Sequence, residues 1–365
     1  MEQEMIYTIA LSMVPMVGPV TAKELIKTIG SAEEVLKSSE RKLLRVAGVG
    51  PALSQQLRSA NFIEKAEQEM KFLQKNHLRA IAFHQAEYPI RLKRCADSPL
   101  VLYVNGNSNL ENRRIISVVG SRLATEYGKG ICREFIQELR PYHPIIVSGL
   151  AYGIDITAHK EALLNGLETL AIVGHGLDRI YPPTHTSVAK EIAMQGAIVS
   201  EFCSEVKPDR ENFPARNRII AGMSDATIVV EAREQGGALI TAEMANQYNR
   251  DVFAFPGRIN DVQSKGCNQL IRNNSAQLLS STSEFLDALG WDEAQKTNIQ
   301  KKLFIDLTEE ERVIVEYLIH SSVNVGYDQL LNHLNWKNSK LSTVLLQLEI
   351  NGLVKSLPGS MFRLC

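Results

Sequence analysis

Between residues 79 and 292 the chain alternates short apolar runs with longer amphipathic stretches. The apolar runs are 114–120, 144–149, 169–174, 197–201, 226–232 and 251–257. Most of them are apolar at nearly every position, which is typical of strands buried on both faces, whereas a half-exposed strand alternates. The stretches between several of these runs have the length of helices. This pattern predicts an α/β domain built on a doubly wound parallel sheet.

The preceding residues predict a small helical domain over 1–78. Two of its segments, 14–26 and 44–57, each place a glycine-containing bend before a helix-like run. Ser31 and Glu34, which lie between these segments, have the spacing of a capping box. The doubled bend is similar to a helix-hairpin-helix pair, in which backbone amides bind a phosphate. A plain αα-hairpin explains the same glycines without any contact to DNA.

The last block, residues 304–365, predicts three helices followed by a hairpin, which is the order of a winged helix. Thr308 and Glu311 have capping-box spacing at the start of its first helix. The candidate recognition helix supplies only Lys337 and Lys340 as basic residues. Binding to DNA and packing against protein are both open for this domain, and the sparse basic charge favours packing.

Composition narrows the classes of function. The 365 residues are 44% hydrophobic and 22% charged, with a formal net charge of −1, so a nucleic-acid site must be a local patch. This composition excludes disorder as the main state, and no apolar run approaches the roughly 18 residues of a membrane span. The first residues carry two glutamates, unlike a secretory signal. Five scattered cysteines without a CxxC pair indicate free thiols in the cytoplasm.

Ligands of doubly wound sheets bind at the carboxyl ends of the strands, so the residues after each strand are the informative ones. Gly120, Ser121 and Arg122 follow the first predicted strand of the sheet domain. They offer a tight turn, a hydroxyl group and a fork of donors suited to phosphate oxygens. The segment lacks GxGxxG and the chain lacks GxxxxGK[ST], so neither a dinucleotide site nor a P-loop is indicated. A surface arginine after a glycine turn is the plainer interpretation.

The strongest local signal lies in residues 207–218, where basic side chains concentrate in a nearly neutral chain. The side chains that could contact a nucleic acid are Lys207, Arg210, Phe213, Arg216, Asn217 and Arg218. An exposed aromatic ring among arginines is a platform for base stacking, and guanidinium groups bind phosphates. The segment therefore predicts a nucleic-acid site. The alternative is a solvated basic loop whose phenylalanine packs into the core.

Two further strand ends extend this candidate surface. Gly236 and Gly237 open a helix, and the N-terminus of a helix favours an anion. Lys265 and Asn268 follow the last predicted strand. Because the carboxyl ends of parallel strands meet at one edge of a sheet, we expect these residues to share a surface with room for more than one phosphate.

Asp155 and His159 lie four residues apart at the start of a predicted helix. They could form a metal or acid–base pair, but two ligands are too few for a metal site. We favour a helix cap and an orienting hydrogen bond. The chain shows no nucleophile–base pair and no carboxylate dyad at a recognisable spacing. The sequence therefore predicts a binding protein without catalytic residues, metal or cofactor.

Six motifs of the central domain carry a resemblance to a known family. VGSR, SGLAYGID..AH, FPARNRIIAGMSDATIVVEA, GGALITAE, RDVFAFPG and KGCNQLIR occur in the order found in the DprA family, also called Smf or DNA processing protein A. The chain resembles this family densely over about 80–280 and more loosely in its flanking domains. One departure is EQGGALITA, where many relatives read Ser-Gly before Ala-Leu-Ile-Thr-Ala, and Gln235 and Gly236 preserve that turn.

The resemblance implies an extended Rossmann-like domain that binds single-stranded DNA in the bacterial cytoplasm. It implies protection of incoming strands during natural transformation, competence and DNA processing, with loading of the RecA recombinase. It further implies action with single-strand binding protein and a homodimer, without a membrane. The strand-contacting residues by motif are Arg122, Phe213, Arg216 and Arg218, with Lys207 and Arg210 as helpers.

Two other functions fit parts of the sequence. Phosphoribohydrolases with a Rossmann-type fold cleave nucleoside monophosphates and carry a similar pattern to Gly236, Gly237, Thr241 and Glu243, with a one-residue difference at Thr241. Such an enzyme would release free base from nucleoside monophosphates. A winged-helix regulator would instead bind duplex DNA through residues 305–365 alone, which the sparse basic charge of that segment argues against.

Overall fold

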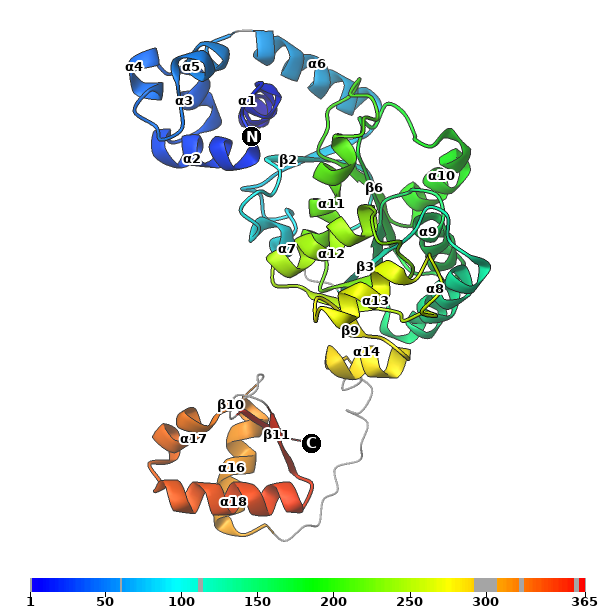
Figure 1. Ribbon diagram of the computed structural model, residues 1–365. Coiled ribbons are helices and arrows are strands. Elements are labelled where there is room, and N and C mark those ends of the chain that lie inside the picture. The colour runs from blue at the N-terminus through cyan, green and yellow to red at the C-terminus, as the bar shows by residue number, and fades with distance from the viewer. Residues whose placement is uncertain are drawn as a thin grey trace. The chain divides into compact units, whose positions relative to one another are not determined.

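The computed structural model describes residues 2–59, 61–110, 114–291, 307–321, 325–357 and 361–364. The chain folds as two compact units, Met1–Trp291 and Asp292–Cys365. Figure 1 shows the larger unit as a group of N-terminal helices followed by a layered α/β part. Among the described residues, no helix combines the length and the apolar character needed to cross a membrane.

A mixed sheet forms the centre of the larger unit. Its strands are β1 (Arg79–Ala82), β2 (Val101–Gly106), β3 (Ile115–Val119), β4 (Ile145–Ser148), β5 (Thr169–Val173), β6 (Ala197–Ser200), β7 (Ala226–Val229), β8 (Asp251–Ala254) and β9 (Gln277–Leu278). They lie in the order β1-β2-β6-β5-β4-β3-β7-β8-β9. All six predicted strands are present, and those from β6 to β9 pair in parallel. The α/β fold class is therefore confirmed.

The edge formed by β1 and β2 differs from the fully parallel sheet that the sequence suggested. β1 pairs antiparallel with β2, and β2 pairs antiparallel with β6. Between β1 and β2 the chain forms only the short helix α7 (Ile90–Lys93). These two strands make the sheet mixed rather than fully parallel, with its antiparallel pairs at one edge.

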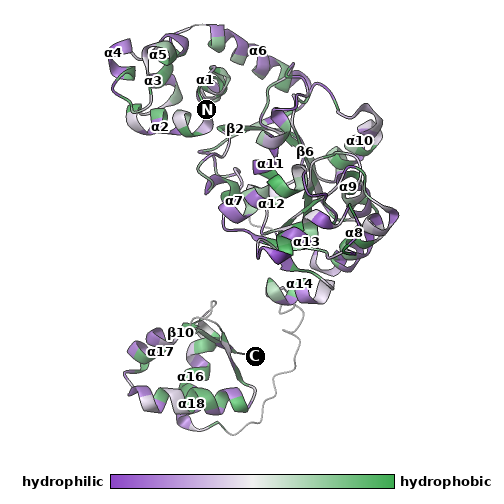
Figure 2. Cartoon of the chain, viewed as in Figure 1, coloured by the Kyte–Doolittle hydropathy of each residue, from purple (hydrophilic) through white to green (hydrophobic). Residues whose placement is uncertain are grey.

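Helices cover both faces of the sheet. They are α8 (Glu126–Glu138), α9 (Ile154–Leu164), α10 (Thr186–Gln195), α11 (Asn212–Met223), α12 (Gly237–Gln247), α13 (Lys265–Arg272) and α14 (Thr282–Ala288), with short helices η1 (Arg140–Tyr142) and η2 (Pro183–His185). Ile115 and Val119 of β3 pack with α11, α12 and α13, whereas Ile116 and Val118 pack with α8, α9 and α14. Figure 2 shows hydrophobic and hydrophilic positions mixed along α13, as an amphipathic helix requires, whereas α11 is buried at every position from Arg216 to Met223.

The N-terminal helices pack against the β1–β2 edge. They are α1 (Glu2–Met13), α2 (Pro19–Ile29), α3 (Ala32–Lys37), α4 (Glu40–Leu43), α5 (Pro51–Leu57) and α6 (Asn61–Lys75). α2 and α5 each begin with proline directly after a glycine, Gly18 or Gly50, which are the two predicted bends. Val101 and Tyr103 of β2 lie in the same hydrophobic core as these helices. Ser31 caps α3 through the amide of Glu34, as its spacing predicted.

The smaller unit is a winged helix, as predicted. It consists of α16 (Glu309–His320), β10 (Val325–Gly326), α17 (Tyr327–Leu334), α18 (Asn338–Ile350), β11 (Val354–Leu357) and β12 (Met361–Leu364). Thr308 and Glu311 form the complete capping box at the start of α16. β11 and β12 pair as an antiparallel hairpin, which is the wing. Lys340 on α18 is paired with Glu310, which reduces the basic charge of the recognition helix further.

Candidate nucleic-acid interface

A cavity of about 530 Å³ opens at the carboxyl ends of β3 and β7. These two strands are neighbours in the sheet, but the chain continues from β3 to β4 on one side and from β7 to β8 on the other. Such a topological switch point leaves a crevice between the loops, where doubly wound folds bind ligands. Of the thirteen candidate residues, those that line it are Gly120, Ser121, Arg122, Arg210, Phe213, Arg216, Asn217, Gly236 and Gly237.

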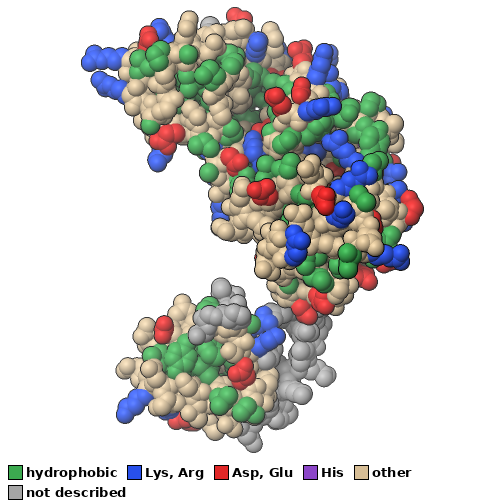
Figure 3. Space-filling model, in the orientation of Figure 1, with side chains coloured by type: hydrophobic (Ala, Val, Ile, Leu, Met, Phe, Trp, Pro, Cys, Tyr) green, Lys and Arg blue, Asp and Glu red, His purple; other side chains and the backbone are tan. Residues whose placement is uncertain are grey.

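The cavity has a strongly positive lining. Arg122, Arg210, Arg216 and Arg233 face it, and among the described lining residues Asp155 is the one carboxylate. On the face shown in Figure 3, Lys and Arg side chains gather between the positions that α11 and α9 occupy in Figure 1. Concentrated guanidinium groups in a concave site attract polyanions and raise their rate of association.

Arg216 forms part of the cavity floor and is only 4% exposed. Its guanidinium donates to the backbone carbonyl of Ile172, and its Nε has no hydrogen-bond partner. Gly149 leaves the space for this position of the side chain, because a Cβ atom there would meet the guanidinium. Burial lowers the pKa of Arg216 to about 10, opposed by the charge of Asp155, so the side chain stays protonated at neutral pH. Arg216 therefore places a positive charge in the cavity floor, where it attracts a phosphate.

Asp155 braces the loop that leads from β4 into α9. Its carboxylate accepts from the backbone amides of Gly149 and Ala151 at 3.2 and 3.4 Å. Burial raises the pKa of Asp155, and Arg216 opposes that shift. His159 bonds to Thr169 instead, at 2.7 Å. Asp155 therefore braces the preceding loop and neither caps α9, whose N-cap is Gly153, nor orients His159, as the sequence had favoured. No group of three or more metal-ligating side chains occurs in the described part of the chain.

The tautomer of His159 follows from its neighbours. The hydroxyl of Thr169 donates to the carbonyl of Ile146 at 2.8 Å, so its oxygen must accept from Nδ1–H of His159. The other ring nitrogen, Nε2, is buried without a partner. Burial, together with the positive charge of Arg216, lowers the pKa of His159 to about 3. A proton on Nε2 would create an uncompensated buried charge.

The lowered pKa of His159 predicts that the protein loses stability in acid. The folded pKa of about 3 lies below the ordinary value of 6.5, so between these pH values the unfolded chain binds a proton that the folded chain does not. The free energy of unfolding is therefore expected to fall on acidification below pH 6.5, by up to about 1.4 kcal/mol per pH unit. Urea unfolding at a series of pH values checks this. His159→Gln should flatten the dependence, and an identical slope in both proteins would contradict the assignment.

Phe213 lies at the start of α11 and is partly exposed beside the cavity. The guanidinium carbon of Arg122 lies 5.3 Å from the centre of its ring. The ring of Tyr181 lies 6.1 Å away on another loop, with the two planes at 33°. The phenylalanine is therefore not packed into the core, which was the alternative considered from the sequence.

The turn that carries Arg122 is held by Glu231, a buried carboxylate at the end of β7. Its oxygens accept from the amide and the hydroxyl of Thr125, and its backbone carbonyl accepts from the amide of Ser121 at 2.7 Å. Gly128 leaves the space for this carboxylate, since a Cβ atom there would collide with it. The turn is thus preorganised without any ligand.

α12 begins at the cavity with Gly236 and Gly237, both of which are exposed. The side-chain amide of Asn217 donates to the carbonyl of Gly237 at 3.3 Å and ties α11 to the start of α12. The first amides of an α-helix lack partners inside the helix and carry its positive dipole end. Asn217 is 8% exposed, so its contact positions the helix end rather than offering a free amide to a base.

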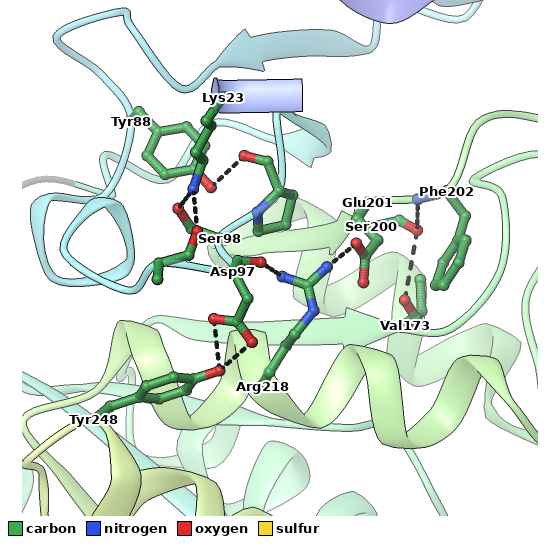
Figure 4. A network of polar contacts seen from close by, with 12 residues as sticks. Lys23, Tyr88, Asp97, Ser98, Val173, Ser200, Glu201, Phe202, Arg218 and Tyr248 are labelled. Atoms are coloured by element: carbon green, nitrogen blue, oxygen red, sulfur yellow. Dashed lines mark hydrogen bonds and ion pairs between the residues drawn. The ribbon is translucent and has the colours of Figure 1, made fainter. Parts of the chain in front are cut away.

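Arg218 does not join the other candidates. It is 9% exposed and lies outside the cavity lining, where its guanidinium pairs with Glu201 and donates to the carbonyl of Asp97. Figure 4 shows this network, which extends through Asp97 to Tyr248. The hydroxyl of Tyr248 donates to the carboxylate of Asp97 at 2.7 Å. Two residues along an α-helix are separated by about 200°, so Arg216 and Arg218 face opposite sides of α11. The expectation that Arg218 shares one surface with Arg122 is therefore wrong.

Three other candidates lie outside the cavity lining. Lys207 is exposed on the loop before α11. Lys265 pairs with Glu234 at 3.5 Å. The amide of Asn268 exchanges hydrogen bonds of 3.1 and 3.0 Å with the backbone of Gly257 and closes the loop after β8. The contacts of Lys265 and Asn268 are thus with the protein itself.

Arg233 and Gln263 were not predicted from the sequence. Arg233 lines the cavity directly after the β7 strand, and the strand-end rule applied to the other turns would have found it. Gln263 accepts from the hydroxyl of Ser121 at 3.0 Å and from Nε of Arg233 at 3.3 Å. It belongs to the loop after β8, far from Ser121 in sequence, and no local signal marks it.

Three family models match the chain. The model described as DNA recombination-mediator protein A matches residues 79–290. A SAM-like helix-hairpin-helix tandem matches residues 9–60, and the DprA winged helix domain matches residues 305–360. The order of these matches follows the three parts of the fold described above.

Individual relatives agree with these models. Protein Smf from Synechocystis is 37% identical over 293 residues, 79% of this chain and 73% of its own. Protein Smf from Escherichia coli is 33% identical over 339 residues, 91% of this chain and 90% of its own. The X-ray structure of DNA processing protein A from Streptococcus pneumoniae has a TM-score of 0.62 at 33% identity, covering 78% of this chain and 97% of that one. The chain therefore belongs to the DNA recombination-mediator protein A family, whose members are named DprA or Smf.

Proposed function

We propose that the cavity at the β3 and β7 strand ends binds single-stranded DNA and carries out no catalytic turnover. The observation that carries this proposal is the presence of four guanidinium groups, the Phe213 ring and the first residues of α12 in one cavity. Guanidinium groups and helix N-termini neutralise phosphates, while an aromatic face stacks on any base. A single strand offers both its phosphates and its base faces, whereas a duplex encloses the faces in its own stack.

The residues proposed to contact the strand are those of the cavity lining. Arg122, Arg210 and Arg216 are assigned to phosphates, together with Arg233, and Phe213 to a base. Gly120, Ser121, Gly236 and Gly237 supply the close backbone approach, and Asn217 orients α12. Lys207 is assigned a weaker, longer-range attraction. Lys265, Asn268 and Arg218 are assigned to holding the protein's own loops, because each of them already bonds to the protein.

A relative supports the choice of single-stranded DNA. The solved structure of DNA processing protein A from Helicobacter pylori describes that protein's single-stranded DNA binding mode. It has a TM-score of 0.54 at 31% identity and covers 60% of this chain and 98% of that one. We infer for this chain the wider role of its family, which is DNA processing in natural transformation with protection of incoming strands and loading of RecA.

The family also suggests the partners and the setting. We propose RecA, single-strand binding protein and a second copy of this chain as partners, in the cytoplasm. We propose three domains, at residues 1–78, 79–292 and 304–365, of which the central one binds the strand. In the winged helix, Leu346 and Ile350 are exposed on α18, which supports contact with protein more than with DNA.

The phosphoribohydrolase alternative finds less support. Gly236 and Gly237 line the cavity, but Glu243 lies in a different groove, between α12 and α13. The hydroxyl of Thr241 donates to the carbonyl of Gly237 inside α12 at 2.9 Å. The glycines and the carboxylate therefore do not converge on one ribose phosphate.

Competition between nucleic acids tests the proposed function. A labelled single-stranded oligonucleotide bound to the full-length protein should be displaced by unlabelled single strands at much lower concentration than by duplex of equal length. Equal or better displacement by duplex would contradict the proposal. Incubation of the same protein with nucleoside monophosphates should release no free base, and release at a steady rate would favour the enzyme.

A further inference from the structure

We infer that Tyr152 and Tyr181 form a second base-stacking subsite beside the cavity, on the loops that follow β4 and β5. This inference rests on the proposed binding of single-stranded DNA and extends it. In this subsite the rings stack on bases of the strand after it leaves the cavity. It takes any base, because every base presents a stackable face.

Both tyrosine rings are exposed; the Tyr152 ring is held by its neighbours, and the backbone of Tyr181 is anchored. Tyr152 is 48% exposed and Tyr181 is 45% exposed. The hydroxyl of Tyr152 lies 3.0 Å from that of Thr184. The Tyr152 and His185 rings pack in a T-shaped arrangement with their centroids 4.8 Å apart. The backbone amide of Tyr181 donates to Nε2 of the buried His175 at 3.3 Å. Rings that are fixed before binding lose little conformational entropy when a base stacks on them.

The two rings continue the cavity rather than form a separate patch. Tyr181 lies 6.1 Å from Phe213, whose ring is in turn 5.3 Å from the guanidinium of Arg122. Ala151, the residue before Tyr152, lines the cavity. The strand order β5-β4-β3-β7 places Tyr181, Tyr152, Arg122 and Arg233 on successive loops at the carboxyl ends of the strands, and Phe213, at the start of α11, lies near both Tyr181 and Arg122. Neighbouring strands are about 4.8 Å apart, so these loops form a continuous row.

The row has two chemically different halves. The loops after β3 and β7 supply guanidinium groups, through Arg122 and Arg233. The loops after β4 and β5 supply the tyrosines, and the nearby Arg179 is already bonded to Asp178 at 2.9 Å. The cationic half recognises the phosphates and the tyrosine half recognises the bases. A strand without bases should therefore lose its contacts with the tyrosines but keep its contacts with the guanidinium groups.

Strands with and without bases test this inference. The binding of an oligo-dT strand is compared with that of an abasic strand of equal length and charge, for the full chain and for Tyr152→Ala, Tyr181→Ala and the double variant. Each substitution is expected to weaken oligo-dT binding by about 5- to 150-fold while leaving abasic binding and the salt dependence unchanged. Tyr181→Phe should bind as tightly as the unchanged protein, whereas Tyr181→Leu, which keeps apolar volume without a ring, should not.

Controls separate this inference from the proposed function. Leu164 and Met194 are 81% and 78% exposed at the far ends of α9 and α10, and their alanine variants should bind both strands normally. If the unchanged protein fails to bind oligo-dT, the proposed function fails. If it binds but the tyrosine variants bind oligo-dT equally well, the subsite alone is refuted. An equal loss on oligo-dT and abasic strands would also refute stacking, because it would indicate a purely structural role.

Discussion

Replacing Arg218 with alanine is expected to lower the free energy of unfolding by about 3–5 kcal/mol, since this is the usual cost of removing one partner of a buried ion pair. The guanidinium pairs with Glu201, whose second carboxylate oxygen is buried without a hydrogen-bond partner. It also donates to the carbonyl of Asp97, in the loop where Lys23 of the N-terminal helices donates to Ser98. The substitution would therefore leave a buried carboxylate and loosen the junction between the helices and the sheet.

The loss should depend on pH. Burial raises the pKa of Glu201 from 4.5 to about 7 even with Arg218 beside it. A folded pKa above the unfolded one gives stability that is complete below pH 4.5 and is lost as the pH rises through 7. Without the arginine the carboxylate is harder still to ionise, so Arg218→Ala should be more destabilising at pH 8 than at pH 5.

Urea unfolding at both pH values measures this effect, with Glu201→Gln and the double variant completing a thermodynamic cycle. In the double variant most of the destabilisation caused by Arg218→Ala should be relieved, because no buried charge is left unpaired. Unchanged stability together with weaker DNA binding and a smaller salt dependence would show that Arg218 contacts phosphate after all.

Replacing Arg122 with alanine is expected to weaken single-stranded DNA binding by about 10- to 100-fold, the usual range for the loss of a charged hydrogen bond. Arg122 is exposed at the cavity mouth, and its turn is held by Glu231 and Gln263 through neighbouring residues. The binding surface should therefore stay folded when the guanidinium is removed. The slope of log affinity against log salt should fall by about 0.7 for each phosphate that the variant no longer neutralises.

Titrations at several salt concentrations check this expectation. Arg122→Lys keeps the charge but not the fork of donors, so it should retain the salt slope and recover only part of the affinity. Arg140 provides a matched control. It is exposed on η1, which precedes β4 at the amino ends of the strands, and its alanine variant should bind normally. Equal losses in Arg122→Ala and Arg140→Ala would indicate that general charge, and not this cavity, controls binding.

Local sequence patterns predicted much of the fold. Continuous apolar runs identified β3 to β8, because a strand covered by helices on both faces has no polar side. Glycine–proline bends marked the starts of α2 and α5, and the spacing of Thr308 and Glu311 marked α16. The strands β1, β2 and β9 were not among those predicted. β1 and β9 are short and partly exposed and so lack a continuous apolar run, whereas the buried apolar run of β2 was overlooked.

The candidate site was predicted in part. Residues on strand-end turns, such as Gly120, Arg122 and Gly236, line the cavity because parallel strands deliver their carboxyl ends to one edge. Within α11 the same reasoning could not separate Arg216 from Arg218, because both follow Phe213 in one basic segment. Nothing in the sequence connects Tyr181 with Phe213, since their loops follow different strands.

By itself, the sequence determined the succession of strands, turns and helices and the basic character of the segment before and within α11, because backbone and burial preferences are local. Only the tertiary structure decided which arginine side chains pair within the protein and which line the cavity. Arg218 meets Glu201 and the carbonyl of Asp97, whereas Arg216 lines the cavity. The opposite facing of the two residues follows from the helical period once both are known to lie in α11, whereas their partners are distant in sequence and no local pattern records them.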